Sequence, residues 1–279
     1  MSQSIDNAFV QQFERDVHLA YQRMGSKLSN MVRKKVNVKG ESTTFQRVGK
    51  GSAGTKTRHG NVPTMSLVHD PVKCFLEDHY AADYIDKLDE LKINHDERMV
   101  VAQSAAGAMG RKSDDIIITA MEATTERETE TGTDPLATSA SRAKIEKVFQ
   151  QFGDDDVPDD GERYWVVSPS GWIDLLTQDA FTNADYIGTD ELPFKGGMTA
   201  KRWLGFMWVT FSGLPTTGTG KRKSFAFHRS AIGHASGQDV KTEIGWITEK
   251  QAHMHVSSMS QGAVLIDAKG CYEMQYHEA

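Results

Sequence analysis

The chain has 279 residues, which is enough for one large domain or two ordinary ones, and 38% of them are hydrophobic and 25% charged. This composition excludes a fully disordered or fibrous chain, and no apolar run approaches the ~18 residues of a membrane span. The formal net charge of −6 argues against a protein that mainly coats DNA, and two cysteines, Cys74 and Cys271, are too few for a disulfide framework, so we expect assembly in a reducing cytoplasm.

The first predicted element is an amphipathic helix over residues 6–32. Its apolar stripe recurs at spacings of three and four residues, through Phe9, Phe13, Val17 and Tyr21. Such a stripe needs a partner surface, either the core of its own chain or a neighbouring molecule. Gly25 and the serine after it indicate a kink or an early end of the helix.

A β-hairpin is predicted next, over residues 36–68. One strand covers about 36–48, a glycine-rich run follows at 49–54, and a weaker strand extends over about 55–67, ending near Pro63. The hairpin has few apolar residues, and a two-stranded ribbon of this kind is marginal by itself. We therefore expect another surface to support it.

Residues 75–123 are predicted to be the helical centre of the chain. Tyr80 and Tyr84, followed by two leucines (Leu88 and Leu91), indicate one helical face, and Asn94 is suited to cap a second helix that reaches Met121. Gly107 and Gly110 weaken this second helix, so two shorter helices remain an alternative.

The remaining chain predicts an α+β unit. A Thr-, Glu- and Ser-rich connector covers 124–141, an acidic turn covers 153–162, and Ser168 with Pro169 is typical of a helix N-terminus. A further helix is expected at 141–152, and strands are expected at 164–167, 206–211, 224–228, 244–247, 252–256, 263–267 and 272–276.

Charge is distributed unevenly along the chain. Between residues 31 and 60, eight basic residues face only Glu41, which gives +7, whereas residues 122–163 carry −7. Separated opposite patches can attract copies of the same chain and orient their encounter. The alternative is two solvated surfaces that never meet.

Two glycine-rich loops invite a nucleotide-binding interpretation. The run from Gly49 to Thr57 reads GKGSAGTKT, in which Thr55 separates the last glycine from Lys56, so the phosphate-binding pattern is broken. The second loop, 213–223, carries Pro215 at the position of a required glycine. Mobile hairpin tips explain both loops better.

His253 and His255 have the spacing of a metal-binding pair on one strand face, with His228, His234 or His277 as a third ligand. We expect an exposed strand face instead. The run 154–156 lacks the alternating pattern of a calcium loop, so a solvated turn is expected there. No residues assemble into a catalytic constellation, and we assign no catalytic, cofactor-binding or metal-binding residue and no cofactor.

The order of these elements resembles the major capsid protein of tailed double-stranded-DNA bacteriophages, with the Hong Kong phage-type capsid fold. Stretches throughout the chain carry the resemblance, and their ordered set matters more than any single motif. They are Gln12–Phe13, Tyr21–Leu28, Phe45–Gly49, Gly110–Ile117, Ala226–Gly233 and Asp239–Glu243.

The resemblance implies a division of the chain into five parts. These are an N-arm at 1–36, an extended hairpin, the E-loop, at 37–72, a peripheral domain with a spine helix at 73–125, an axial domain at 126–243, and closing strands of the peripheral domain at 244–279.

The resemblance also implies a function without catalysis. The chain would assemble as pentamers and hexamers into an icosahedral shell that encloses packaged double-stranded DNA in a virion, built in the host cytoplasm and matured from a procapsid. Because the chain starts at the arm, a separate scaffolding protein is expected, with a portal protein as a further partner and a decoration protein as an optional one; no membrane partner is implied. No Lys–Asn crosslink pair can be matched.

Inter-subunit contacts are expected from Arg47, Lys50, Lys56 and Arg58 of the E-loop. The arm stripe of Phe9, Phe13, Val17 and Tyr21 is expected to contact neighbours in the same way. The alternatives are the shell of a protein nanocompartment, a nucleotide- or metal-dependent enzyme, and a nucleic-acid-binding module that works through the basic hairpin.

Overall fold

The structure, a computed structural model, describes residues 25–87, 97–128, 136, 139–178, 181, 201–218 and 220–278. The chain divides into two compact units. Unit 1 contains residues 1–26, 78–112 and 238–260, and unit 2 contains residues 27–77, 113–237 and 261–279. The stripe Phe9, Phe13, Val17 and Tyr21 lies outside the described residues, as do Leu88, Leu91 and Asn94.

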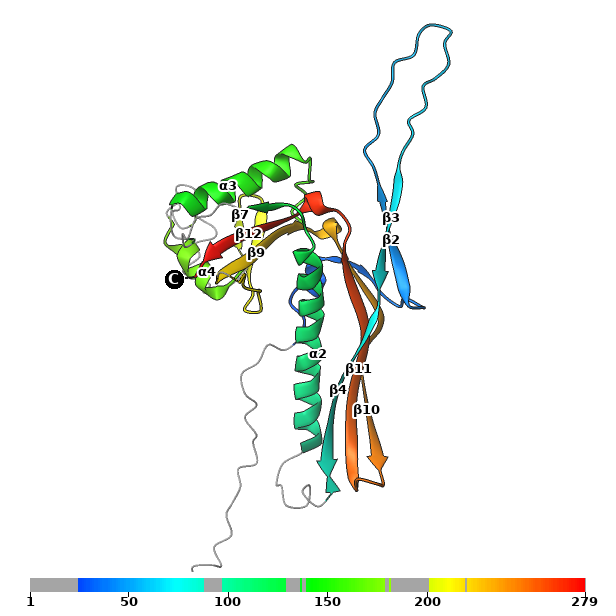
Figure 1. Ribbon diagram of the computed structural model, residues 1–279, viewed down its shortest axis with the longest axis vertical. Coiled ribbons are helices and arrows are strands. Elements are labelled where there is room, and N and C mark those ends of the chain that lie inside the picture. The colour runs from blue at the N-terminus through cyan, green and yellow to red at the C-terminus, as the bar shows by residue number, and fades with distance from the viewer. Residues whose placement is uncertain are drawn as a thin grey trace, which may run out of the picture. The chain divides into compact units, whose positions relative to one another are not determined.

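A six-stranded sheet forms the centre of unit 2 (Figure 1). The sheet is mixed: β12 is parallel to β5, and β6 is parallel to β8, whereas the other neighbours are antiparallel. The strands, in spatial order, are β5 (Arg127–Glu128), β12 (Cys271–His277), β9 (Lys221–His228), β6 (Arg163–Val167), β8 (Phe206–Thr210) and β7 (Lys201–Trp203).

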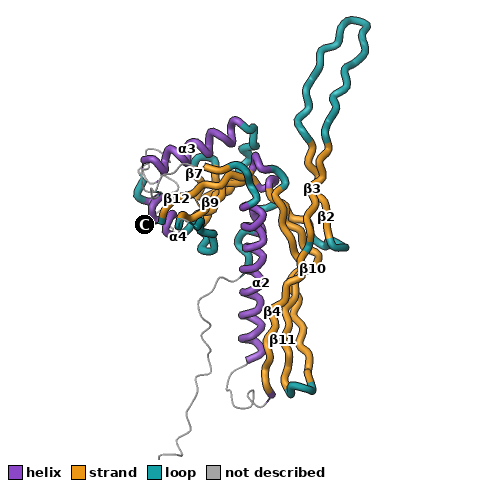
Figure 2. Tube along the Cα trace, in the orientation of Figure 1, coloured by secondary structure: helices purple, strands orange, loops and turns teal. Residues whose placement is uncertain are grey.

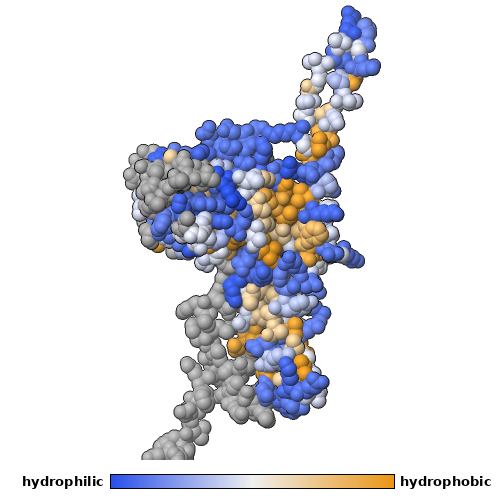
Figure 3. All heavy atoms as spheres, in the orientation of Figure 1, coloured by the Kyte–Doolittle hydropathy of each residue, from blue (hydrophilic) through white to orange (hydrophobic). Residues whose placement is uncertain are grey.

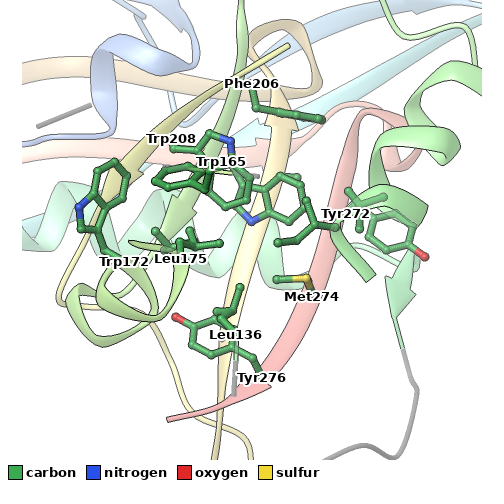
Figure 4. Close-up of a cluster of buried hydrophobic side chains, with 14 of the residues drawn as sticks. Leu136, Trp165, Trp172, Leu175, Phe206, Trp208, Tyr272, Met274 and Tyr276 are labelled. Atoms are coloured by element: carbon green, nitrogen blue, oxygen red, sulfur yellow. The ribbon is translucent and has the colours of Figure 1, made fainter. Parts of the chain in front are cut away.

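This sheet buries both of its faces, because successive side chains of a strand point to opposite sides. Trp165 belongs to a cluster with α3 (Ser139–Asp154) and α4 (Pro169–Leu176), and the indole of Trp165 stacks on that of Trp208 at 4.4 Å (Figure 4). The next residue, Val166, belongs to the cluster on the other side with Ile117 and Met121 of α2 (Glu97–Glu122). The sheet is therefore the middle layer of unit 2.

A four-stranded sheet has the order β1 (Arg33–Lys35), β10 (Ile232–Ile247), β11 (Ala252–Leu265) and β4 (Glu77–Asp86). β1 is short and pairs in parallel with β10 only from Gly233 to Ala235. Three short 3-10 turns, η2 (Ser29–Met31), η4 (Arg229–Ala231) and η5 (Ala268–Gly270), lie between these elements along the chain.

The helix α2 is continuous, as the longer of the two alternatives predicted. Its glycine at position 110 has a packing reason: a Cβ there would lie 2.5 Å from the carbonyl carbon of Gly25. The predicted helix does not continue to residue 32: Gly25 has φ +71° and residues 29–31 form only a 3-10 turn, which agrees with the predicted break at Gly25 and the serine after it.

One helix prediction and several strand predictions need correction. Residues 77–86 form the strand β4 rather than a helix. The second hairpin strand lies at 69–75, not at 55–67. The predicted strand 252–256 and most of the predicted strand 263–267 belong to the single strand β11, which ends at Leu265, and β10 begins at residue 232, well before the predicted 244.

Residues 124–141 are predicted to be a flexible connector, but the described part contains a strand. Arg127 and Glu128 form the short strand β5, which pairs with β12. Within the described part of the chain, none of the helices is both long enough and apolar enough to cross a membrane.

Candidate assembly surfaces

The hairpin predicted from the sequence is present, with a short paired root and a long loop. β2 (Ser42–Val48) and β3 (His69–Phe75) are antiparallel over seven residue pairs, from Ser42↔Phe75 to Val48↔His69. Beyond these pairs no strand is formed, and Figure 2 shows the far part of the hairpin as loop. We call residues 49–68 the hairpin loop and residues 42–48 with 69–75 the hairpin root.

The hairpin root is anchored on its own chain. Phe45 and Cys74 are buried in a small cluster with Ala235 and Ile266. Two glycines permit this contact. A Cβ on Gly233 would lie 2.7 Å from the Phe45 ring, and a Cβ on Gly262 would overlap the carbonyl oxygen of Phe75. The root therefore does not depend on a neighbouring molecule for its packing.

The hairpin loop, by contrast, buries almost nothing. Every residue from 49 to 68 is exposed except Gly60, which is half-buried. Apolar side chains share this exposure: Val62 is 71% exposed, Val68 70% and Met65 53%. In Figure 3 the loop, which extends to the top of the picture, is mainly hydrophilic with apolar residues interspersed.

The basic residues predicted to act in assembly fall into two groups. The Arg47 guanidinium lies 3.9 Å from the Asp267 carboxylate and donates to the carbonyl oxygen of Ile266 at 3.3 Å. The Lys50 ammonium lies 2.6 Å from the Asp156 carboxylate. Across residues 25–278 as far as they are described, neither Lys56 nor Arg58 has an ion pair. Both lie in the exposed hairpin loop.

The basic segment 31–60 and the acidic segment 122–163 thus contact each other within one chain. Asp156 comes from the acidic turn after α3, and its neighbour Asp155 pairs with Lys269 at 2.7 Å. The hydrogen bond from Lys269 lowers the pKa of Asp155 below its usual range, and the hydrogen bond from Lys50 does the same for the pKa of Asp156. The pair of Lys50 with Asp156 is exposed on both sides, so salt screens it, whereas the Asp155 side chain is largely covered.

The arm is anchored at its base by α2. Asp114 is fully buried, and its two carboxylate oxygens accept the backbone N–H groups of Lys27 (3.2 Å) and Leu28 (3.0 Å). Leu28 and Val32 are fully buried in the cluster that also contains Ile117. We call residues 25–32 the arm root.

Neither glycine-rich loop has the surroundings of a phosphate site. Residues 49–57 lie in the exposed hairpin loop, and the loop between β8 and β9 leads into a strand rather than a helix. In this second loop Arg222 donates to the carbonyl oxygen of Leu214 and pairs with Glu278 at 2.7 Å.

The histidine pair is not the exposed strand face that we expected. His255 is buried, and the half-buried His253 packs against Trp246 with ring centroids 4.8 Å apart. In the described ranges, the metal-ligating side chains that converge in a group of three are Asp160, Glu162 and His228, which includes neither of them.

Internal partners already occupy the group around His228. Its Nε2 lies 3.1 Å from Asp160, its Nδ1 lies 2.7 Å from the Ser230 hydroxyl, and Glu162 pairs with Arg229 at 2.6 Å. A cation would have to displace the guanidinium, so we assign no metal site.

The anchoring residues were missed by the sequence analysis. Asp114, Gly233 and Gly262 carry no local signal for their roles, since each acts on a residue far away in the sequence. Two of the stretches quoted for the family resemblance, 21–28 and 110–117, do meet at the arm root, where Leu28 is bound by Asp114.

Comparisons with known proteins agree with this arrangement. The sequence model of the phage capsid protein family matches residues 5–278. The structure resembles the capsid protein of the cyanophage P-SCSP1u with a TM-score of 0.78 and 16% identity, covering 100% of this chain and 96% of that one. For Mycobacterium phage Che8 the TM-score is 0.76 at 17% identity, with 96% and 97% covered.

The mature capsid of bacteriophage PhiM1 is similar as well, with a TM-score of 0.73 at 13% identity over 97% of this chain and 93% of that one. No curated protein matches the sequence. The predicted α+β capsid fold is thus confirmed.

Proposed function

Because the chain belongs to the family of phage capsid proteins, we propose that it is the major head subunit, which assembles as pentamers and hexamers into an icosahedral shell around double-stranded DNA. The shell subunit acts by binding copies of itself, and we assign it no catalytic step. The single observation that carries this proposal is the hairpin loop: apart from the exposed ion pair of Lys50 with Asp156, it buries almost nothing against the part of the chain that the structure describes.

The physical reason is the cost of leaving the loop uncovered. Val62, Met65 and Val68 would each contribute about 1.5–3 kcal/mol if they were transferred from water into a packed contact. An equivalent contact recurs around every subunit of a closed shell, so modest contacts add up. Lys56 and Arg58 can orient the loop on an acidic surface of the neighbour.

Electron microscopy of the full chain, expressed alone and with the scaffolding protein of its phage, tests the proposal by the presence or absence of closed shells. The informative variant is Lys56→Glu/Arg58→Glu, which breaks no ion pair of the described chain. We expect an unchanged circular dichroism spectrum and melting temperature, with a shell yield lower by about tenfold or more. Shells at full yield would refute the role of the loop.

The matched control is Lys39→Glu/Lys73→Glu, which changes the charge equally at exposed positions outside the hairpin loop. It should leave the shell yield near that of the parent chain. Lys50→Glu is made separately, because it also breaks the contact with Asp156 inside the chain.

We further propose the five-part division at 1–36, 37–72, 73–125, 126–243 and 244–279 as functional regions. Unit 1, which joins residues 78–112 with 238–260, supports a peripheral domain built from both sides of the axial domain in sequence. The six-stranded sheet of unit 2 supports an axial domain that begins near residue 126, although the sheet also includes β12 from the segment 244–279.

The remaining partners are proposed from the family role. A scaffolding protein, a portal protein, non-specifically packaged DNA and a decoration protein would bind the assembled shell, which would form in the host cytoplasm. The arm side chains Phe9, Phe13, Val17 and Tyr21 are proposed to contact other copies. A pull-down of the assembled shell, followed by mass spectrometry, tests the protein partners.

A further inference from the structure

The strand β10 forms one edge of the sheet in unit 1, and most of this edge is open (Figure 1). β1 pairs with β10 only at Gly233–Ala235, and one further bond joins the N–H of Val38 to the carbonyl oxygen of Ser236 at 3.0 Å. Along residues 238–247, no other strand of the described chain pairs with this side of β10. The edge therefore offers its backbone N–H and C=O groups to a further strand.

The side chains of this edge are exposed on both faces of the strand. All nine residues from 238 to 246 are exposed. Apolar side chains occupy alternate positions and so share one face, where Val240 is 43% exposed and Ile244 50%. The other face carries charges, and the Lys241 ammonium lies 2.5 Å from the Glu243 carboxylate. A long, exposed edge strand with apolar side chains is a template for pairing with another chain.

The sequence of the edge complements itself in the antiparallel direction. Two copies of β10 can lie side by side about a two-fold axis, with Thr242 of one opposite Thr242 of the other. In this register Lys241 of each copy lies opposite Glu243 of the other. Val240 of each copy likewise lies opposite Ile244 of the other. Opposite residues share a face, with Cβ atoms ~4.5–5.5 Å apart, so opposite charges meet on one face and apolar side chains on the other.

Charge also excludes the nearest alternative registers. A two-fold axis perpendicular to the sheet leaves each side chain on its own face, so one residue must lie opposite itself. If that residue were Lys241, two lysines would face each other, and if it were Glu243, two glutamates would. Like charges directly opposite each other destabilise a strand pair. The register centred on Thr242 is therefore favoured over both.

The other edge strand of this sheet, β4, does not have this property. It carries four acids and no lysine or arginine: Glu77, Asp78, Asp83 and Asp86. Pairing of β4 with a second copy would gather only negative charge, and charged side chains are a usual protection of edge strands. In β10, by contrast, the charges favour a second copy.

We propose that β10 of two copies pairs in the antiparallel direction about Thr242, through residues 239–245, so that the sheets of the two copies become one continuous sheet. The inference deepens the proposed function, and its place in the shell rests on that function. The contact is isologous, whereas adjacent copies within a pentamer or hexamer are not related by a two-fold axis. It would therefore join neighbouring pentamers and hexamers rather than copies within one of them.

A single cysteine near the axis tests the register in the full chain. In Thr242→Cys the two thiols face each other, whereas in the matched control Gln238→Cys, on the same face of β10, they are eight residues or ~27 Å apart. Cys74 and Cys271 are buried, so they compete little for oxidation. On a non-reducing gel, we expect crosslinked dimers of Thr242→Cys to form at least about tenfold faster than those of Gln238→Cys. Equal rates would refute the pairing.

Charge reversal separates the contact between copies from the ion pair within each copy. Lys241→Glu and Glu243→Lys, each added to Thr242→Cys, place like charges opposite each other, so either variant alone should crosslink about tenfold more slowly. An equal mixture of the two should recover most of the lost rate, because opposite charges then meet across the axis while the ion pair within each copy remains broken.

The same mixture made with Gln238→Cys should stay slow, which controls for general attraction between the two altered chains. If the mixture with Thr242→Cys crosslinked no faster than the separate variants, Lys241 and Glu243 would not meet across the axis and the proposal would be wrong.

The crosslinking is measured on the unassembled subunit and on shells, and shell formation is scored separately by electron microscopy. Shells in which Thr242→Cys fails to crosslink would refute the strand pairing alone. Crosslinked dimers of the subunit without shells under any condition would refute the proposed function and leave the strand pairing in place. A failure to crosslink in both preparations would refute the pairing.

Discussion

Removing the Asp114 carboxylate should loosen the arm root from α2. The substitution Asp114→Ala deprives the N–H groups of Lys27 and Leu28 of their acceptor. A buried donor without a partner costs about 1–3 kcal/mol. The Leu28 donor is buried, whereas the Lys27 donor is only partly buried, so we expect the free energy of unfolding to fall by about 2 kcal/mol.

The alternative is that the arm root detaches and lets water reach both donors. Detachment would expose Leu28 and Val32, which are fully buried, at a cost of about 1.5–3 kcal/mol each. This cost exceeds the free energy that hydration of the two donors would recover, so the arm root should stay in place but open more often. Asp114→Asn keeps one acceptor oxygen, and about half of the loss is expected.

Urea unfolding measures the loss, and amide hydrogen exchange at Lys27 and Leu28 locates it. Asp115→Ala is the control, since Asp115 is the next residue of α2 and is exposed. If Asp114→Ala and Asp115→Ala unfolded at the same urea concentration, with equal protection of both amides, the carboxylate would not be the anchor.

Two further predictions concern the hairpin root and the sheet of unit 2. Gly262→Ala should lower the free energy of unfolding by about 1–3 kcal/mol in urea, because its methyl group would overlap the carbonyl oxygen of Phe75, whereas Gly153→Ala, whose Cβ would meet nothing within 4 Å, should not lower it. Burial raises the pKa of Tyr276 to about 12, above the ~10 of a tyrosine in an unfolded chain. The contribution of Tyr276 to the free energy of unfolding is therefore complete below pH 10 and is lost as the pH rises toward 12. Tyr276→Phe removes the hydroxyl group that is hydrogen-bonded to Ser168, so this variant should be less stable than the parent at pH 8. In thermal melts between pH 10 and 12, however, the variant should lose less stability than the parent. Equal losses over that interval would contradict the raised pKa of Tyr276.

Local signals predicted α3, α4 and β6 of unit 2 well. Ser168 caps α4 as expected, with its hydroxyl oxygen accepting from the N–H of Gly171 at 3.0 Å, and Pro169 takes the first helical position. Such a cap depends only on residues within one helical turn, so it can be predicted from a single sequence.

The error at β4 has an equally local cause. Tyr80 and Tyr84 are four residues apart, a spacing that puts two side chains on one face of a helix and also on one face of a strand. In β4 both rings are exposed, 69% and 45%, so they report no buried face of either element.

The candidate surfaces were predicted only in part. The basic hairpin was recognised from its charge, but the contact of Lys50 with Asp156 joins residues 106 positions apart, and we expected such pairing between copies. Leu28 and Asp114 are separated by 86 positions. The hydrophobic periodicity of one sequence does not specify which residues pair when they are this far apart along the chain.

The small cluster beneath the hairpin root has a consequence for the order of events during synthesis. Phe45 and Cys74 leave the ribosome long before Ala235 and Ile266, the residues on which they pack. Non-local contacts of this kind form late, because the intervening chain must close into a loop before they gain anything. The hairpin of a nascent chain therefore stays undocked until nearly the whole polypeptide has emerged, which delays the competence of each new copy to associate until its own translation is almost finished.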